Sequence, residues 1–149
     1  IRLWAQERGV ELPAQPEGES CAVRWVCFAA FRESNAPARA AASHWHSVFI
    51  DGEGRLSSCG SAPTFDPSVL GHGEGVLRLN TPTRLPSMLG GERAVSVSAG
   101  LAHSFALTAS GAAWSWGTDS LLPTKVEAFT GQRVVAVSAN TWHSLALTA

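Results

Sequence analysis

The sequence predicts an all-β protein built from repeated antiparallel meanders, and three observations support this class. The segment at 95–109 recurs at 135–149 with ten of fifteen residues identical, without a gap and at an offset of 40 (135 minus 95). Residues 46–60 align with 103–117 without insertion, at an offset of 57 (103 minus 46). Each copy reads as short strands separated by glycine-containing connections, with no helical pattern between copies. Strand repeats of this length are typical of a β-propeller or a similar array.

Residues 1–36 do not repeat, and we expect them to form a short helical segment and a linker. The first nine residues can form an amphipathic helix, and Pro13 and Pro16 mark a connector. Ser20 can cap a second helix, whose apolar residues fall at helical spacing. Pro37 disfavours a helical conformation in the residue before it, so this helix is expected to end there.

The first repeat is expected over residues 40–94 and should contain a β-hairpin followed by a long connection. Gly54 falls at the hairpin tip and Gly60 at a strand end, which are both positions where glycine is common. The connection contains the sequence Leu-Gly-His-Gly at 70–73. An alternating stretch at 76–79 could form a fourth, outer strand.

The second repeat, over residues 95–134, predicts strands that are covered on both faces. Phe105 and Leu107 alternate with Ala106 and Thr108, so one strand face is bulky and the other is small. Because neither face carries a charge, such strands belong in sheets that are packed on both sides. Small side chains would let a neighbouring sheet approach closely.

The later repeats are shorter than the first. Gly117 and Pro123 are 6 positions apart (123 minus 117), whereas Gly60 and Pro82 are 22 apart (82 minus 60). This difference predicts that the middle repeat lacks or abbreviates its outer strand. The third repeat, over 135–149, stops after its second strand, so we expect the sequence to be a fragment of a larger protein.

The connection between the first two strands of a repeat contains Gly100 in the second copy and Asn140 in the third. Glycine and asparagine are the residues that accept a positive φ most readily. We therefore predict a tight left-handed turn at both positions.

Several motifs recur across the repeats in a fixed order. They are the middle copy at 98–117 (SAGLAHSFALTASGAAWSWG), its proline-containing lead-in at 81–95, and the LGHG turn at 70–73. Together they resemble the regulator of chromosome condensation repeat, over about residues 40–149. That family forms propellers of about seven blades. The resemblance implies a partial β-propeller over residues 37–149, with about two blades and the start of a third.

The N-terminal segment carries a second resemblance. It combines Leu3 and Trp4, a proline-containing link, Trp25, and a helix that ends near Arg32. This pattern looks like the segment that follows an F-box in substrate adaptors of cullin-type ubiquitin ligases. An unrelated helical cap or linker is the alternative interpretation.

A histidine followed by serine occupies one position in every repeat, as His46, His103 and His143. Three histidines can suggest a zinc site. Residues repeated once per blade are spread around the propeller axis, however, and have no reason to converge on one ion. We therefore predict that each imidazole hydrogen-bonds to the backbone of a neighbouring strand. His44 shares a strand face with His46, but no third metal ligand is identifiable.

We accordingly expect structural repeat positions and no catalytic, cofactor-binding or metal-binding residue. The serines lack an acidic partner in register, which argues against a serine nucleophile. Trp114 and Trp116 point to one strand face and are expected to pack between blades. The predicted structural positions are His46, Ser47, Gly54, Gly60, Gly100, His103, Ser104, Gly111, Trp116, Gly117, Asn140, His143 and Ser144.

Composition excludes several classes of partner. Eleven basic and twelve acidic residues give a net charge of −1, without the clustered lysine and arginine that direct DNA binding requires. Three cysteines are too few for a disulfide scaffold, which favours a reducing, intracellular compartment, either cytoplasmic or nuclear. No apolar run reaches the length of about 18 residues that a membrane-spanning helix needs, so no membrane partner is expected.

The two resemblances together imply a non-enzymatic protein-interaction module. The expected role is a scaffold or substrate-recognition part of a ubiquitin-ligase-associated propeller protein, with protein partners and no cofactor. The alternative is guanine-nucleotide exchange on a small GTPase, which is the activity of the founding member of the repeat family.

Overall fold

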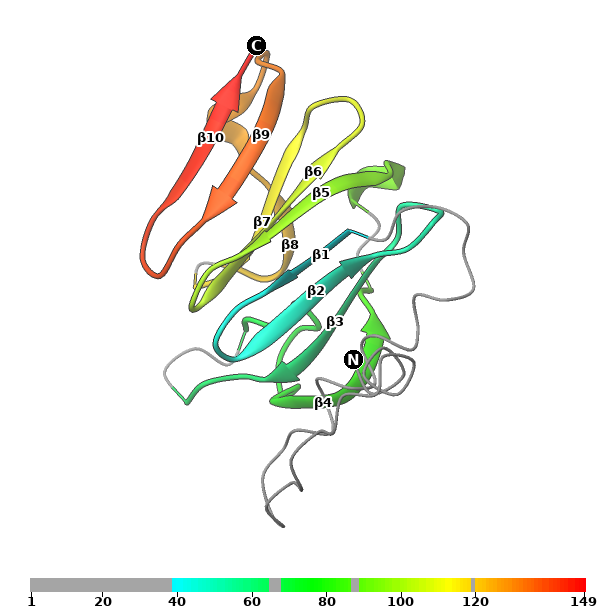
Figure 1. The fold of residues 1–149 in the computed structure, drawn as a ribbon, viewed down its shortest axis with the longest axis vertical. Coiled ribbons are helices and arrows are strands. Elements are labelled where there is room, and N and C mark those ends of the chain that lie inside the picture. The colour runs from blue at the N-terminus through cyan, green and yellow to red at the C-terminus, as the bar shows by residue number, and fades with distance from the viewer. Residues whose placement is uncertain (1–38, 65–67, 87–88, 119) are drawn as a thin grey trace, which may run out of the picture.

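The computed structural model describes residues 39–64, 68–86, 89–118 and 120–149, which form three antiparallel sheets (Figure 1). The first sheet contains β1 (Arg39–Ala42), β2 (His46–Ile50), β3 (Leu56–Ser61) and β4 (Arg78–Arg84). The second contains β5 (Ala94–Ala99), β6 (His103–Thr108), β7 (Ala113–Gly117) and β8 (Ser120–Lys125). The third contains β9 (Val134–Ala139) and β10 (Ser144–Thr148).

Each sheet is a meander, because strands that are neighbours in sequence pair antiparallel. The sheets are stacked in chain order, so that β5 contacts β1 and β2 while β9 contacts β5 and β6 (Figure 1). This arrangement confirms the predicted fold class, with two four-stranded blades and the first two strands of a third. The helical segment predicted for residues 1–36 lies outside the described residues.

Helical structure within the described residues is limited to two short 3-10 turns. They are η1 (Leu89–Gly91), which precedes β5, and η2 (Glu127–Phe129), which precedes β9. In this part of the chain no helix has both the length and the apolar character needed to cross a bilayer.

Packing between the sheets follows the alternation in the sequence, with a bulky face against a small one. Val48 and Ile50 on β2 are fully or almost fully buried and share one hydrophobic cluster with Ala106 on β6. On the opposite face of β6, Leu107 packs with Ala146 of β10 in a second cluster. The small side chains let successive sheets approach closely enough for the branched side chains to lose their contact with water.

The middle blade differs from its prediction. β8 pairs with β7 and is six residues long, so the middle blade does not lack its outer strand. What is shortened is the connection, which spans only 118–119 in the middle blade but 62–77 in the first. The outer strand of the first blade begins at Arg78, halfway through the stretch at 76–79 that was expected to form it, and extends to Arg84.

The long connection of the first blade reaches across to the second blade. The Ser68 hydroxyl donates to the Gly117 carbonyl at 2.8 Å, and the Trp116 indole donates to the Val69 carbonyl at 3.1 Å. The Gly73 amide donates to the Leu121 carbonyl at 3.1 Å. We call residues 68–73 the bridging segment. It fixes the first two blades to each other, which explains why the first repeat is longer than the second.

Trp114 and Trp116 offer a matched test of the bridging segment, because both lie on β7 but only Trp116 bonds to it. The Trp114 indole nitrogen is buried without a hydrogen-bond partner among the described residues. We expect Trp116→Phe to lower the free energy of unfolding by about 1–3 kcal/mol, since the buried Val69 carbonyl loses its donor. Trp114→Phe should be close to neutral. Urea unfolding followed by circular dichroism measures both, and equal losses would contradict the assignment.

Candidate functional site

The repeated histidines connect successive sheets through the repeated serines. The His46 Nε2 atom lies 2.6 Å from the Ser104 Oγ atom, and this hydrogen bond is buried. The His103 Nε2 atom lies 2.7 Å from the Ser144 Oγ atom. Each histidine therefore bonds to the serine that follows the histidine of the next repeat. The partner identified on the next sheet is a side-chain hydroxyl, where a backbone group was predicted.

His46 is fixed at both ring nitrogens. Its Nδ1 atom lies 2.9 Å from the Ser43 Oγ atom, on the connection that precedes β2. The imidazole is only 2 % exposed, so hydroxyl groups take the place of water on both sides of the ring. This engagement leaves neither nitrogen for a metal ion. No cluster of three or more His, Cys, Asp or Glu side chains within the described ranges could hold one.

The first and last members of the histidine and serine series lie at the two ends of the stack. His143 is exposed on the connection between β9 and β10, and Ser47 is half-buried on β2. No further sheet follows His143 or precedes Ser47 within the part of the chain that the structure describes.

Ser104 and Ser47 provide a test of the histidine–serine bonds, because they occupy the same repeat position. Ser104→Ala removes the hydroxyl that faces the buried His46 nitrogen and should lower the free energy of unfolding by about 1–3 kcal/mol. Ser47→Ala should change it by less than about 0.5 kcal/mol. Chemical denaturation compares the two variants. A Ser104→Ala variant as stable as Ser47→Ala would show that the bond contributes nothing.

The glycines at the two hairpin tips contact the next sheet directly. The Gly54 carbonyl accepts from the Ala94 amide at 2.9 Å, and the Gly111 carbonyl accepts from the Val134 amide at 3.0 Å. Ala94 and Val134 begin the first strands of the following sheets. The same backbone bond thus joins each hairpin tip to the next blade, a role that the sequence analysis did not predict.

This contact leaves no room for a side chain at the tip. A Cβ atom added at Gly54 would lie 2.7 Å from the Arg93 Cβ atom, and one at Gly111 would lie 2.5 Å from the Arg133 Cγ atom. Arg93 and Arg133 are equivalent residues, 40 positions apart (133 minus 93). The sequence signal that could have revealed the contact is this pairing of a tip glycine with an arginine just before the next strand.

A comparison of Gly54→Ala with Gly131→Ala separates the stability cost of the close contact with the next sheet from the cost of a positive φ. Their φ angles are 78° and 79°, but nothing lies within 4 Å of a Cβ added at Gly131. Alanine in this conformation costs about 1–2 kcal/mol at either site. Gly54→Ala should cost at least about 1 kcal/mol more, because Arg93 must also move. Thermal or chemical unfolding measures the difference, and equal costs would exclude a role for close approach.

The left-handed turn predicted at Gly100 and Asn140 is absent. Neither residue has a positive φ. A Cβ atom at Gly100 would instead lie 2.5 Å from the His103 Cε1 atom and collide with the Asn140 carbonyl of the next blade. Glycine is therefore required here by the close approach of the neighbouring blade.

The two strand-end glycines lie opposite the histidines. Gly60 pairs with His46 and Gly117 pairs with His103 across each hairpin. Both have a positive φ, of 130° and 113°. A Cβ atom at either glycine would lie 2.6 Å from the Cα atom of the paired histidine. Because each glycine has no side chain, the backbone of the paired histidine can lie directly against it.

Cys59 is the one cysteine among the described residues. It is buried on β3 and packs with Phe49 and Leu79 in a small hydrophobic cluster that is separate from the other two.

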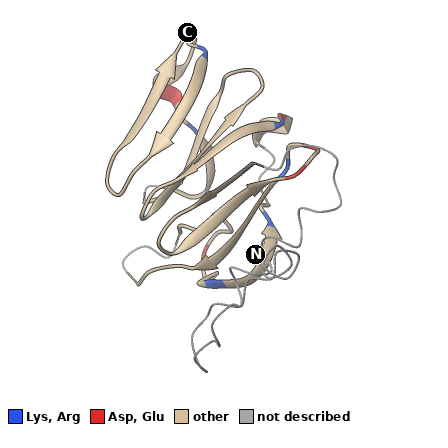
Figure 2. Cartoon of the chain, viewed as in Figure 1, with Lys and Arg blue, Asp and Glu red and all other residues tan. Residues whose placement is uncertain are grey.

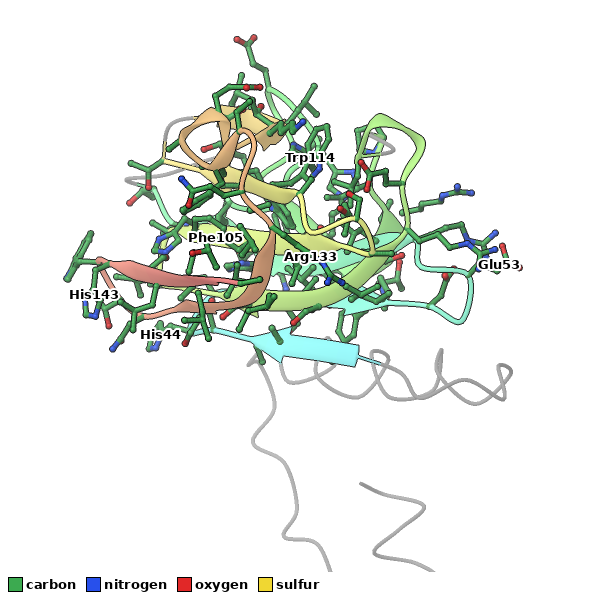
Figure 3. The ribbon with its side chains drawn as sticks, turned by 90° about the horizontal axis from the view of Figure 1, so that it is seen from above. His44, Glu53, Phe105, Trp114, Arg133 and His143 are labelled. Atoms are coloured by element: carbon green, nitrogen blue, oxygen red, sulfur yellow. The ribbon has the colours of Figure 1, made fainter. Side chains whose placement is uncertain are left out.

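The ends of the strands form two rims with different chemistry. We define the loop rim as the connections at 43–45, 100–102 and 140–143, and the hairpin rim as 51–55, 85–86, 89–93 and 109–112. The loop rim contains no lysine, arginine, aspartate or glutamate, whereas charged residues gather at the hairpin rim and on the outer strands (Figure 2). Figure 3 shows His44 and His143 at one end of the strands and Glu53 at the other.

The loop rim exposes aromatic side chains. Trp45 is 38 % exposed and Trp142 is 75 % exposed, at equivalent positions of the first and third repeats. The His44 ring packs edge-on against Trp45 with a centroid separation of 4.8 Å. Exposed tryptophan without nearby charge is a common feature of protein-binding surfaces.

The hairpin rim contains a pocket of about 290 Å³ between the first two blades. Its lining comes from the tip of the β2–β3 hairpin, the end of β4 and the lead-in to β5. The lining residues are Glu53, Gly54, Arg55, Leu56, Arg84, Leu85, Leu89, Gly91, Glu92 and Arg93. The pocket is therefore apolar at its base and charged at its edge.

Hydrogen bonds organise the carboxylates around this pocket. Burial alone would raise the pKa of Asp51, but donation from the Arg55 amide and side chain and the Glu53 amide outweighs burial and lowers it. The Ser110 hydroxyl donates to Glu92 and lowers the pKa of that carboxyl. Arg55 also pairs with Glu53 at 2.5 Å. The lowered pKa values favour the ionised form of Asp51 and Glu92.

Comparison with known proteins agrees with this geometry. Residues 94–120, which include β5 to β7, match the regulator of chromosome condensation (RCC1) repeat. The structure of human WBSCR16 is similar with a TM-score of 0.68 and 22 % identity, over 80 % of this chain and 32 % of that one. No curated protein matches the sequence.

Two yeast structures are also similar. One is Prp20p from Saccharomyces cerevisiae, described with its binding to Gsp1p and histones, with a TM-score of 0.58, 23 % identity, and coverage of 78 % of this chain and 32 % of that one. The other is yeast RCC1 (Prp20) bound by Kap60, with a TM-score of 0.60, 22 % identity, and coverage of 72 % and 29 %. The chain thus spans about a third of the length of these structures, and the likeness concerns the fold.

Proposed function

We propose that this chain, a member of the regulator of chromosome condensation repeat family, is a protein-interaction module. The observation that carries the proposal is the loop rim, where Trp45 is exposed on connections that contain no charged residue. Histidine–serine bonds between the sheets hold the connections of this rim in fixed positions. An exposed aromatic side chain on a connection that is held in place suits protein binding, because little conformational entropy is lost on association.

The similar structures support this class of function. Prp20p is described as binding Gsp1p and histones, and yeast RCC1 (Prp20) as bound by Kap60. By analogy we propose protein partners for this chain. The near-neutral charge of the sequence argues against direct binding to DNA.

The specific role that we propose is a scaffold or substrate-recognition part of a ubiquitin ligase. Its motivation is the resemblance of Leu3, Trp4, Trp25 and Arg32 to the segment that follows an F-box. These residues lie outside the described ranges. In this role the N-terminal segment would contact the ligase, and the rims would contact the substrate protein.

Affinity purification of the full-length protein tests both levels of the proposal. We expect cullin-adaptor components and further protein partners to be recovered together. Trp4→Ala should lose the adaptor components and keep the other partners, whereas Trp45→Ala should do the reverse. Recovery of partners without any adaptor component would exclude the ligase role, and recovery of no protein partner would exclude the interaction module.

Guanine-nucleotide exchange is the second candidate, and the similarity to the Gsp1p-binding Prp20p favours it. Exchange requires contacts that eject the nucleotide, and no residue in these repeats can be assigned to that task. Nucleotide release from a panel of small GTPases measures this activity directly. Acceleration of release by the full-length protein would favour exchange over the ligase role.

A further inference from the structure

We propose that Thr81 is a phosphorylation site for a proline-directed serine/threonine protein kinase. Thr81 lies on β4, the outer strand of the first blade, and Pro82 follows it directly. This is the one place in the sequence where serine or threonine precedes proline. Arg84, three positions after Thr81, adds a positive charge of the kind by which kinases select their substrates.

Thr81 lies in a bulge at which β4 leaves the regular strand pairing. Between two successive pairs, β3 advances by two residues, from 58 to 60, while β4 goes back by four, from 83 to 79. Residues 80–82 therefore lie opposite a single residue of β3, and a bulge of this kind leaves its extra residues unpaired. Pro82 has no amide hydrogen to donate, and it favours an extended conformation in Thr81.

The side chain of Thr81 is accessible from outside the blade. The residue is exposed, and its hydroxyl makes no hydrogen bond to any described residue. The Thr83 hydroxyl donates to the Thr81 carbonyl at 3.1 Å, which holds the backbone of the bulge in place. Within the described residues β4 pairs with β3 alone, so that no strand covers its outer edge. A kinase can therefore approach an extended segment along this edge.

The second blade shows that the fold does not require threonine at this position. β8 contains the same bulge, in which residues 121–123 lie opposite a single residue of β7. Residues 123–125 (Pro-Thr-Lys) correspond to 82–84 (Pro-Thr-Arg), and Leu122 corresponds to Thr81. Because leucine occupies the position in one of the two blades, the bulge does not depend on a hydroxyl there. The Thr81 hydroxyl is thus available for a role outside the fold.

The modification transfers the γ-phosphoryl group of ATP to the Thr81 Oγ1 atom. The bond from Oγ1 to the γ-phosphorus forms, the bond from that phosphorus to the oxygen bridging it to the β-phosphate breaks, and ADP leaves. The hydroxyl proton passes to the catalytic aspartate of the kinase. This chain supplies the acceptor hydroxyl and the residues around it that the kinase recognises.

Phosphorylation would change the charge of the outer strand. β4 contains two positive residues, Arg78 and Arg84, and no acidic residue. Neither arginine forms an ion pair with a described residue, so both can pair with a phosphate. A phosphothreonine carries about −1.5 to −2 charges at pH 7. The modification therefore converts the strand from basic to nearly neutral and alters the charge that a protein partner meets there.

Incubation of the folded full chain with ATP and a cyclin-dependent kinase, used as the probe enzyme, tests the site. We expect mass spectrometry to find one phosphate, on Thr81. Thr81→Ala should abolish phosphate uptake. Pro82→Ala should slow it about tenfold or more, because the kinase selects its substrate through the residue after the acceptor. Circular dichroism checks that each variant keeps the fold.

Thr124→Ala is the matched control. Thr124 is exposed on the outer strand of the second blade, but it follows a proline instead of preceding one. Its hydroxyl is also hydrogen-bonded, to the Ser120 hydroxyl at 2.7 Å and to the Leu122 carbonyl at 3.0 Å. The replacement should leave phosphate uptake unchanged. Leu122→Thr puts a hydroxyl before Pro123 in the second bulge and should add a second phosphate.

Three outcomes would overturn the proposal: no phosphate on Thr81 of the folded chain, an equal loss of phosphate in Thr124→Ala, or uptake by the urea-unfolded chain alone. The absence of a second phosphate in Leu122→Thr would contradict the role of the bulge in presenting the hydroxyl. The assay contains no partner protein, so its result is independent of the proposed interaction function.

Discussion

The structure depends on one packing arrangement, in which the bulky face of one sheet lies on the small face of the next. Val48 and Ile50 are buried in the same cluster as Ala106, whose small side chain lets the two sheets approach closely. The polar end of the same interface is closed by the bond between His46 and Ser104. Apolar burial supplies the attraction between sheets, and a directional hydrogen bond fixes their alignment.

Glycine makes this close packing possible at more than one contact between neighbouring blades. At Gly54 the neighbouring blade approaches so closely that a side chain would collide with Arg93. At Gly100 the collision would be with His103 and Asn140, although the backbone there is not left-handed. A glycine in a repeat can therefore reflect the distance to the next blade as well as local backbone conformation.

The two rims of the stack offer a partner different chemistry. The loop rim is aromatic and uncharged, and the hairpin rim combines charge with an apolar pocket. The bridging segment joins only the first two blades, and the pocket lies between these same blades. The pocket lies at the hairpin rim, whereas the bridging segment contacts the second blade at Gly117 and Leu121, near the opposite ends of the strands.

The sequence by itself determined the repeat, the strand order within each blade and the structural role of the histidines, because these follow from periodicity and local pattern. It did not determine which atom each histidine contacts, why Gly54 and Gly100 must be glycine, or that β8 completes the middle blade. The first two depend on residues about 40 or more positions apart that meet across two sheets. The third depends on the pairing of β8 with β7. Only the tertiary structure brings Arg84 and Arg93 to one pocket, since they lie on different blades whose relative placement no local pattern encodes.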